Sequence, residues 1–349
     1  MKNMRGMKPM AQVGGVGRGG RRGGFKASAT RLLAFACGPS ILLLLVAHAA
    51  GAQNLSFEEI EKLPASPADH RIAYGDGPLQ FGDLRLPKGR GPHPVVVVVH
   101  GGCWYSEYNL NHVASFGEAL TRMGVATWSI EYRRVGDAGG GWPGTFEDVA
   151  RATDYLRVLA RTYRLDLRRV VVVGHSAGGQ LALWLAGRKG LPPESPLSSP
   201  DPLPLRGVVS LAGINDLRGY GPGCGNAVAK LLGGSPEEMP QRYRQASPIE
   251  LLPLKVKQRL IHGLLDRIVP LKQSSDYEAA ARLRGDDVKL FVAERAGHFD
   301  LISPLSSTWP AVQKALRELL VSGGPKKRAA GKGARPAVKK TMHALKHVH

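Results

Sequence analysis

Four consecutive valines, Val170–Val173, lead directly into the sequence Gly-His-Ser-Ala-Gly-Gly. An uninterrupted run of β-branched residues is typical of a strand that is covered on both faces of a sheet. The glycines on either side of Ser176 permit a tight turn, and the apolar residues that follow predict a helix. This stretch therefore predicts a central strand, a sharp turn at Ser176 and a helix that starts at Ala177.

Short apolar runs alternate with helical stretches from about residue 72 to residue 320. The expected strands are Val95–Val99, Val125–Ile130, Val170–Val173, Gly207–Leu211, Arg259–Ile261 and Val288–Val292. The expected helices lie near Asn111–Met123, Thr145–Tyr163, Ala177–Arg188, Lys272–Arg284 and Thr308–Val321. This alternation predicts one α/β domain, with a doubly wound, mostly parallel sheet and helices on both faces. We expect a loop at the proline-rich stretch 191–204, and an irregular insertion over one end of the sheet at 215–250.

The positive charge of the chain is concentrated at its two ends. The 349 residues include 48 Lys and Arg against 28 Asp and Glu, a formal net charge of +20. Residues 1–31 and residues 325–349 contain many basic residues and no acidic one, so the part between them is nearly balanced. The basic composition therefore does not predict a dedicated nucleic-acid site in the domain.

The amino end has the pattern of an export signal. A basic stretch that ends at Arg31 precedes the apolar segment 32–50, and Ala50-Gly51-Ala52 supplies a small-residue cleavage site. We expect a signal peptide at 1–52 and an exported protein, periplasmic or secreted, with an uncleaved membrane anchor as the alternative. A leader at 53–71 and the catalytic domain at 72–321 are then expected to follow.

The carboxyl end, residues 322–349, is rich in Lys, Arg, Ala, Gly and Pro. Such a composition predicts a disordered basic tail, either simply solvated or able to contact anionic surfaces. Of three cysteines, Cys103 and Cys224 would remain after signal cleavage, and the sequence leaves open whether they pair. The sequence contains no metal-ligand spacing, so neither a metal nor a cofactor is expected. The oligomeric state also stays open.

Ser176 is the candidate nucleophile. The predicted turn raises its hydroxyl above the sheet at the amino end of a helix, where the helix dipole favours negative charge. A serine hydroxyl is a weak nucleophile that needs a base, which is in turn oriented by an acid. For a nucleophile on this kind of turn, the acid and then the histidine follow along the chain.

Two histidines follow Ser176 within the predicted domain. We expect His298 to be the base, because it lies in a loop after a strand, whereas His262 lies at a strand end and is expected to be held in the sheet. Asp266, on the loop after the preceding strand, is the candidate acid. Its competitors are Asp216 and Asp300, of which Asp300 is too close to His298 in sequence to reach across the site easily.

The segment His100-Gly101-Gly102-Cys103-Trp104 follows a predicted strand and supplies candidate oxyanion donors. Glycines there let the N–H groups of Gly101, Gly102 and Cys103 turn toward one point, together with the N–H of Ala177. We expect His100 to brace this loop and Cys103 to be a pocket-lining thiol. The nearby aromatic residues could line a substrate pocket or pack that corner; they are Trp104, Tyr105, Tyr108 and Trp142.

In order along the chain, H-G-G-x-W, E-Y-R, W-P-G-T-F-E-D-V, G-H-S-A-G-G-Q-L-A, G-x-x-D-x-x-V-P and G-H together resemble the α/β-hydrolase superfamily. The chain looks like its small esterase and kynurenine-formamidase-like branch, over roughly residues 72–321. The resemblance implies an α/β-hydrolase fold, with Ser176, Asp266 and His298 as the triad and residues 101–103 as the oxyanion loop. It also implies a structural role for Glu147 and Asp148. Formamidases often have Tyr where this chain has Cys103, which puts the formamidase substrate in doubt.

These residues predict acyl transfer in two steps through an acyl-enzyme, without a cofactor. A carboxylesterase acting on small acyl groups is the leading hypothesis for the function. The alternatives are an arylformamidase or other amidase, and then a peptidase. A non-catalytic protein that adheres through its basic tail is a hypothesis of another class. The expected partner is a small-molecule ester or amide substrate.

Overall fold

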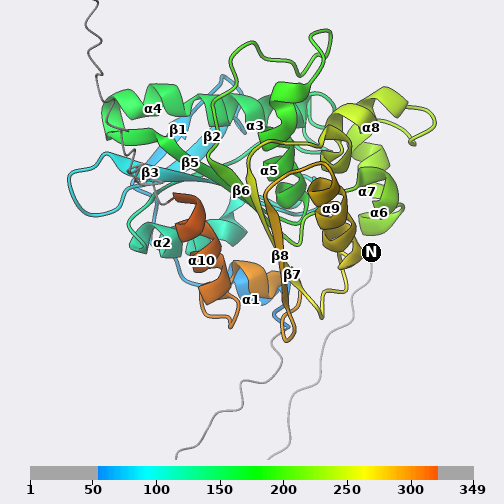
Figure 1. The fold of residues 1–349 in the computed structure, drawn as a ribbon. Helices are drawn as coiled ribbons and strands as arrows, with labels where there is room; N and C mark the ends of the chain where they lie inside the picture. Colours follow the sequence, from blue (N-terminus) through cyan, green and yellow to red (C-terminus); the bar gives the residue numbers. More distant parts are fainter. Residues whose placement is uncertain (1–53, 321–349) are drawn as a thin grey trace, which may run out of the picture. The chain divides into compact units, whose positions relative to one another are not determined.

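The computed structural model describes residues 54–320. The expected signal peptide and basic tail lie outside these described residues. The described part contains a sheet of eight strands in the order β1-β2-β4-β3-β5-β6-β7-β8, with helices on both of its faces (Figure 1). This arrangement confirms the doubly wound fold that the alternation of apolar runs predicts.

The strands are mostly parallel. They are β1 (His70–Ala73), β2 (Phe81–Arg85), β3 (His93–Val99), β4 (Ala126–Ile130), β5 (Leu165–His175), β6 (Gly207–Leu211), β7 (Lys257–Gly263) and β8 (Val288–Ala293). Strand β2 pairs antiparallel with both β1 and β4, and every other pairing in this sheet is parallel. The six predicted strands all form. Sequence analysis missed β1 and β2, which are short and lack a long apolar run.

Two groups of helices cover the two faces of the sheet. One face packs against α1 (Phe57–Glu61), α2 (Ala114–Arg122) and α10 (Trp309–Leu320). The other face carries α3 (Gly144–Asp154), α4 (Leu156–Tyr163), α5 (Ala177–Gly187) and α9 (Lys272–Leu283). Short 3₁₀ helices lie at Leu110–Val113, Arg188–Gly190, Pro248–Leu251 and Phe299–Ile302.

The valine runs show why the sheet is covered on both sides. Successive side chains of a strand point to opposite faces. Val95, Val97 and Val99 accordingly pack with the α3–α5 group, whereas Val96 and Val98 pack with α2 and α10. All five side chains are buried, as a run of valines without alternation predicts.

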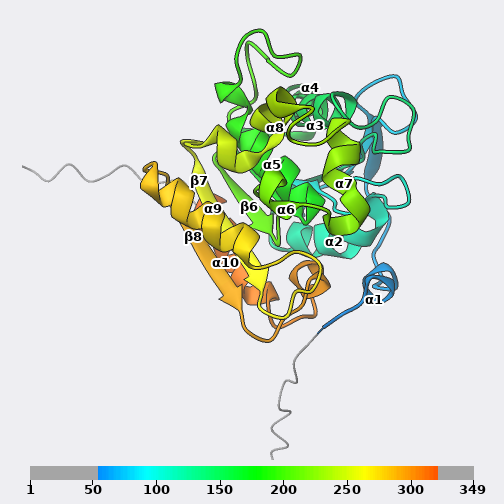
Figure 2. The same ribbon diagram turned by 90° about the vertical axis from the view of Figure 1, so that its right-hand side faces the viewer.

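Two expectations about the organisation of the chain were wrong. Residues 215–250 form α6 (Leu217–Tyr220), α7 (Gly223–Leu232), α8 (Pro240–Ala246) and part of a 3₁₀ turn, so the insertion is helical rather than irregular (Figure 2). The folded region also begins before residue 72. Helix α1 buries Ile60 and places the Phe57 ring 5.8 Å from the Phe299 ring, so the expected leader is packed against the domain.

The proline-rich stretch 191–204 contains no helix or strand, as expected. Within residues 54–320, no helix is both long enough and apolar enough to cross a membrane.

Candidate active site

Ser176 sits on a strained turn between β5 and α5. Its backbone has φ 56° and ψ −122°, a conformation that favours glycine and that serine adopts only at a cost. A Cβ at Gly174 would lie 1.9 Å from the carbonyl oxygen of Gly178, and one at Gly178 would lie 2.3 Å from that of Val99. The flanking glycines are therefore required by close approach of the backbone. The turn places Ser176 at the amino end of α5, as the sequence predicts.

Asp266 and His298 form a buried hydrogen bond. Nδ1 of His298 donates to Oδ2 of Asp266 over 2.6 Å, and the Asp266 carboxylate is completely buried. Its other oxygen accepts from the N–H groups of Ile268 at 2.8 Å and Val269 at 2.9 Å. Burial opposes ionisation, but these bonds and the proximity of His298 hold the pKa of Asp266 below its ordinary value. Asp266 is thus kept as a carboxylate that orients His298.

The other candidates for acid and base make their hydrogen bonds to other groups, although Nε2 of His262 also lies 3.5 Å from Oδ2 of Asp266. His262 is buried in β7, where Nε2 donates to the Val269 carbonyl at 2.9 Å and Nδ1 accepts from the Ser274 hydroxyl at 2.8 Å. Asp216 caps α6 by accepting from the Arg218 N–H. Asp300 accepts from the N–H of Gly297 at 2.6 Å, and burial raises its pKa. The structure pairs neither Asp216 nor Asp300 with His298.

His175, the residue before the nucleophile, was missed by sequence analysis. Its Nε2 donates to the backbone carbonyl of His298 over 3.0 Å, and the two imidazole rings lie 4.4 Å apart. Complete burial, together with the neighbouring His298, holds the pKa of His175 well below its ordinary value, so the ring is neutral. His175 therefore fixes the loop that carries His298. The only feature of the sequence that could have indicated this role is the position of His175 directly before Ser176 in the G-x-S-x-G motif.

The predicted oxyanion loop, residues 101–103, lies directly against Ser176. A Cβ at Gly101 would lie 3.2 Å from the Cβ of Ser176 and 2.8 Å from the His175 carbonyl oxygen, so a side chain there would press on the serine. Gly102 has φ 104°, which only glycine adopts easily. As the first residue of α5, Ala177 has an N–H without an acceptor inside the helix. Gly101, from the loop after β3, and Ala177, from the start of α5, thus both lie next to Ser176.

A buried network holds the beginning of this loop. Both ring nitrogens of His100 lie at hydrogen-bonding distance from an oxygen. Nε2 lies 2.9 Å from Oε1 of Glu131, and Nδ1 lies 2.8 Å from the Gly101 carbonyl oxygen. The Tyr132 ring stacks on His100 with 4.3 Å between the centroids, and its hydroxyl donates to the His100 carbonyl. His100 accordingly has the bracing position that we expected for it.

Cys103 and Cys224 form a disulfide bond, with 6.1 Å between their Cα atoms. The expectation that Cys103 is a pocket-lining thiol was therefore wrong. The sequence could not reveal the pair because 121 positions separate the two residues and only the tertiary fold brings the insertion to the loop. The Tyr105 hydroxyl lies within hydrogen-bonding distance of the carbonyls of both Cys224 and Gly225, at 3.0 and 3.1 Å. These contacts tie the oxyanion loop to α7.

Of the two roles that the sequence leaves open for Trp104, the structure assigns packing rather than substrate binding. Its side chain is fully buried, and its indole N–H donates to Gln180 at 3.1 Å. No face of the ring is left for a ligand. Tyr105 and Trp142 are partly exposed, and the Trp142 ring packs edge-on against Phe146 at 5.6 Å. Either of these two residues has surface that a substrate could contact.

The paired acids Glu147 and Asp148 have different positions on α3. Asp148 is buried and accepts from the Gln80 amide and from the guanidinium and N–H of Arg133, at 2.7 to 3.0 Å. Glu147 is partly exposed and lies 3.7 Å from Arg133. This arrangement fixes α3 to the segment after β4 and is structural, as the family resemblance implies.

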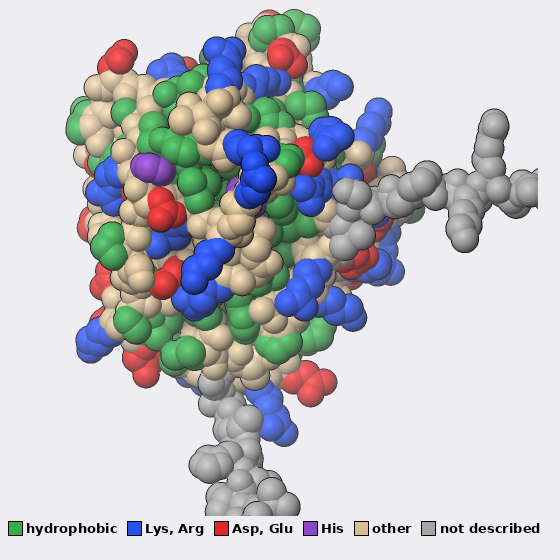
Figure 3. Space-filling model, turned by 90° about the vertical axis from the view of Figure 1, so that its left-hand side faces the viewer, with side chains coloured by type: hydrophobic (Ala, Val, Ile, Leu, Met, Phe, Trp, Pro, Cys, Tyr) green, Lys and Arg blue, Asp and Glu red, His purple; other side chains and the backbone are tan. Residues whose placement is uncertain are grey.

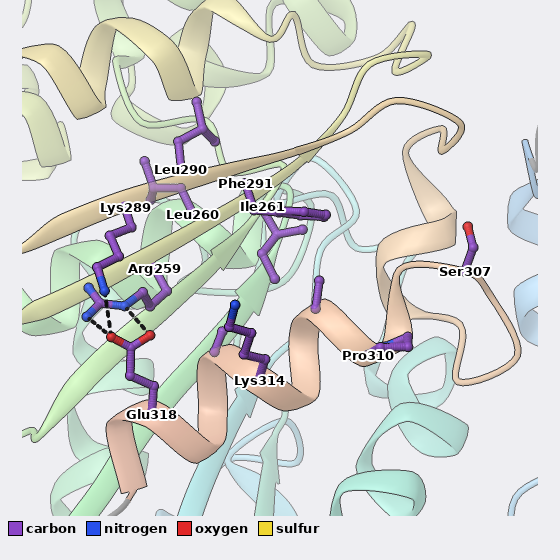
Figure 4. A pocket seen from close by; sticks show the side chains of 12 residues that line it. Arg259, Leu260, Ile261, Lys289, Leu290, Phe291, Ser307, Pro310, Lys314 and Glu318 are labelled. Carbon is purple, nitrogen blue, oxygen red and sulfur yellow. Dashed lines mark hydrogen bonds and ion pairs between the residues drawn. The ribbon is translucent and has the colours of Figure 1, made fainter.

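A separate hollow of about 490 Å³ lies between β7, β8 and α10 (Figure 4). Glu318 projects from α10 toward it and pairs with Arg259 and Lys289, which holds the pKa of Glu318 at about 2. None of Ser176, Asp266 and His298 lines this hollow.

A parallel-sheet fold, a serine on a strained strand-to-helix turn and a buried Asp–His pair together define an α/β hydrolase with a serine nucleophile. A family model described as BD-FAE matches residues 83–280, more than half of the chain. The chain belongs to this family of α/β-hydrolase esterases.

Similar proteins span several kinds of hydrolase. The mouse acylamino-acid-releasing enzyme (Mus musculus) is 27% identical over 272 residues, which cover 70% of this chain and 35% of that protein. The chain thus spans about a third of the length of this relative. A probable isoprenylcysteine alpha-carbonyl methylesterase from Oryza sativa subsp. japonica is 26% identical, over 66% of this chain and 56% of that protein.

Among solved structures, a bifunctional GH43-CE protein from Bacteroides eggerthii has 27% identity and a TM-score of 0.60, over 71% of this chain and 37% of that one. Esterase B from Lactobacillus rhamnosis has a TM-score of 0.64 at 17% identity, over 75% of this chain and 90% of that chain. The second likeness concerns the fold alone.

Proposed function

We propose that this protein hydrolyses carboxylic esters of small acyl groups through a Ser176 acyl-enzyme. His298 removes the proton of the Ser176 hydroxyl as its oxygen attacks the ester carbonyl, and Asp266 stabilises the resulting imidazolium. The N–H of Ala177 and those of the Gly101–Cys103 segment stabilise the oxyanion. Collapse of the tetrahedral intermediate expels the alcohol, with the proton returned by His298. Water then attacks the acyl-enzyme by the same route.

The buried Asp266–His298 hydrogen bond, held beside the strained Ser176 turn by His175, is the observation that carries this proposal. An ionised Asp266 stabilises the His298 ring when that ring takes up a proton and becomes positively charged during the reaction. The preference for small acyl groups is supported by the limited access to the site. Ser176 is 2% exposed and His298 5% exposed, so a large acyl group would have to displace the surrounding side chains.

The names of the similar proteins favour an ester substrate over a formamide. They include esterases, a methylesterase and a bifunctional protein with a CE part. An amidase is the second candidate, which the name of the acylamino-acid-releasing enzyme supports, and a peptidase is the third.

Steady-state hydrolysis by the purified chain tests the proposal. We expect turnover of p-nitrophenyl acetate and butyrate to exceed that of the octanoate, N-formylkynurenine and an N-acetylated amino acid anilide. Ser176→Ala should abolish all turnover and also labelling by a fluorophosphonate. Activity that survives this substitution would refute the catalytic assignment. An unlabelled and inactive parent would favour the non-catalytic alternative.

We also propose that the protein works outside the cytoplasm. The basic and apolar pattern of residues 1–52 suggests export, and the Cys103–Cys224 disulfide supports it because such bonds persist mainly in oxidising compartments. Fractionation of cells that produce the full chain, with Edman sequencing of the exported form, tests this proposal. Recovery in the cytoplasmic fraction alone would contradict it.

A further inference from the structure

The parallel strands β3, β5 and β6 begin at one edge of the sheet, which we call the amino edge. The triad residues follow the carboxyl ends of β5, β7 and β8, at the opposite edge. The amino edge is built from three segments: residues 86–92 before β3, the α4–β5 junction, and the residues before β6. The His93 N–H donates to the Arg164 carbonyl at 2.9 Å, and the Arg169 guanidinium donates to the Pro92 carbonyl at 3.2 Å. The first two segments are therefore in direct contact.

Cations gather at this edge. We call the set the basic face; it consists of Lys88, Arg90, Arg161, Arg164, Arg168 and Arg169. Four of the six have no ion pair with the described residues, whereas Arg168 and Arg169 share the buried carboxylate of Asp166. Two carboxylates contact the same segments: Asp166, and Asp69, whose carboxylate accepts from the Leu86 N–H. The next acidic residues along the chain are already paired elsewhere, Asp83 with Arg71 and Asp154 with Arg188. Six cations against these two carboxylates leave +4.

The charge of the folded part is thus segregated. Residues 54–320 contain 32 Lys and Arg and 28 Asp and Glu, so their whole net charge is also +4. The basic face with its two carboxylates carries the same net charge of +4, so the other Lys and Arg residues of 54–320 equal the other Asp and Glu residues in number. Figure 3 shows many Lys and Arg side chains on one side of the molecule, with hydrophobic side chains and several Asp and Glu side chains among them. Val158, one turn from Arg161 on α4, is 44% exposed.

The chain continues into its basic end from this same edge. Helix α10 ends at Leu320, and a Cβ at Gly207, the first residue of β6, would lie 2.8 Å from the Leu319 side chain. The Arg206 guanidinium also donates to the Leu319 carbonyl at 2.6 Å. Eight further cations and no acidic residue follow in residues 321–349. The last described residue of the chain therefore lies at the amino edge, and the basic sequence follows it.

We propose that the basic face is an interaction surface for an anionic phospholipid bilayer. Arginine guanidinium groups bind phosphate oxygens in a bidentate manner, and cations near an anionic membrane each add binding energy. An exposed apolar side chain beside them, Val158, suits the boundary between headgroups and acyl chains. Because the triad lies at the opposite edge of the sheet, the bound protein would present its active site away from the lipid.

Vesicle co-sedimentation of the full chain tests the proposal. The vesicles are phosphatidylcholine alone, or phosphatidylcholine with phosphatidylglycerol; the neutral vesicles measure any binding by the apolar segment 32–50. The variant Arg90→Glu/Arg161→Glu changes two exposed cations of the basic face. Lys62→Glu/Lys272→Glu makes the same change of charge at two exposed lysines elsewhere. Both variants keep the two basic ends.

We expect the parent to prefer the anionic vesicles, with an affinity that falls as salt rises. The basic-face variant should lose about tenfold or more in affinity, and the control variant less than about threefold. Both should keep the parental melting temperature and turnover of a soluble ester. Equal losses in the two variants, or equal binding to neutral vesicles, would overturn the proposal. Tighter binding of the parent to double-stranded DNA, lost in the basic-face variant, would overturn the bilayer as the partner.

Discussion

His175 holds His298 by its backbone. Nε2 of His175, the residue before Ser176, donates to the backbone carbonyl of His298, the proposed base, over 3.0 Å, and the two rings pack 4.4 Å apart. The nucleophile turn and the base loop come from strands that are not adjacent in the sequence. This contact links them independently of the proton transfer itself.

Removal of this donor should lower kcat without a comparable change in KM. We expect His175→Phe, which keeps a ring of similar size, to lose about 10- to 100-fold in kcat because His298 is no longer held in place. The amide nitrogen of Gln can take the position of Nε2, so His175→Gln should recover most of the rate. Steady-state kinetics with p-nitrophenyl acetate measure both variants. If the Gln variant is as slow as the Phe variant, the hydrogen bond is not the reason.

Asp266 should matter far more than the other carboxylates considered from the sequence. Asp266→Asn leaves the size of the side chain unchanged but removes the charge that stabilises the His298 imidazolium, so we expect kcat to fall about 10³- to 10⁴-fold. Asp216→Asn is the matched control, because asparagine also caps a helix well. Its turnover should stay within about twofold of the parent. A larger effect at Asp216 would reassign the acid.

The strain at Ser176 can be measured as stability. A backbone at φ 56° and ψ −122° is unfavourable for serine, and it is less unfavourable for glycine. Ser176→Gly should therefore raise the free energy of unfolding by about 1 to 2 kcal/mol, whereas Ser176→Ala should not. We expect both variants to be inactive, so urea unfolding is the readout. Equal stability of the two would show that the turn is relaxed in solution.

Reduction of the disulfide should affect both stability and rate. The disulfide joins two residues with a sequence separation of 121. Its loss should therefore lower the free energy of unfolding by about 2 to 4 kcal/mol. The oxyanion loop would also lose its covalent link to α7, and kcat should fall. The Cys103→Ala/Cys224→Ala variant should show the same loss and should no longer respond to dithiothreitol. A parent whose melting temperature ignores dithiothreitol would contradict this prediction.

His112 should make the protein sensitive to mild acid. Burial is the main cause that lowers its pKa to about 3, with the neighbouring His100 adding to it. The unfolded chain binds a proton below about pH 6.5 that the folded chain does not. Stability from this group is thus complete above that pH and falls by up to about 1.4 kcal/mol per pH unit below it, down to the folded pKa.

The variant His112→Asn should reduce this slope by about one proton. Urea unfolding of parent and variant at several pH values between the two pKa values measures the difference. Identical slopes would show that His112 takes up its proton in the folded protein.

Much of this protein follows from local sequence. The Val95–Val99 and Val170–Val173 runs predict buried parallel strands because such strands have no solvent face. The glycines around Ser176 predict the turn because nothing larger fits between the backbones. The order of Ser176, Asp266 and His298 then follows from the order of the strands, and the structure pairs the last two.

The tertiary structure decided whatever depends on segments far apart in the chain. Strands β1 and β2 are short and become strands only through pairing at the edge beside β4. The burial of Trp104, the Cys103–Cys224 disulfide and the contact from His175 to His298 each join residues from separate elements. Local patterns carry no information on such distances, because they arise only when the sheet, the insertion and the loops pack together.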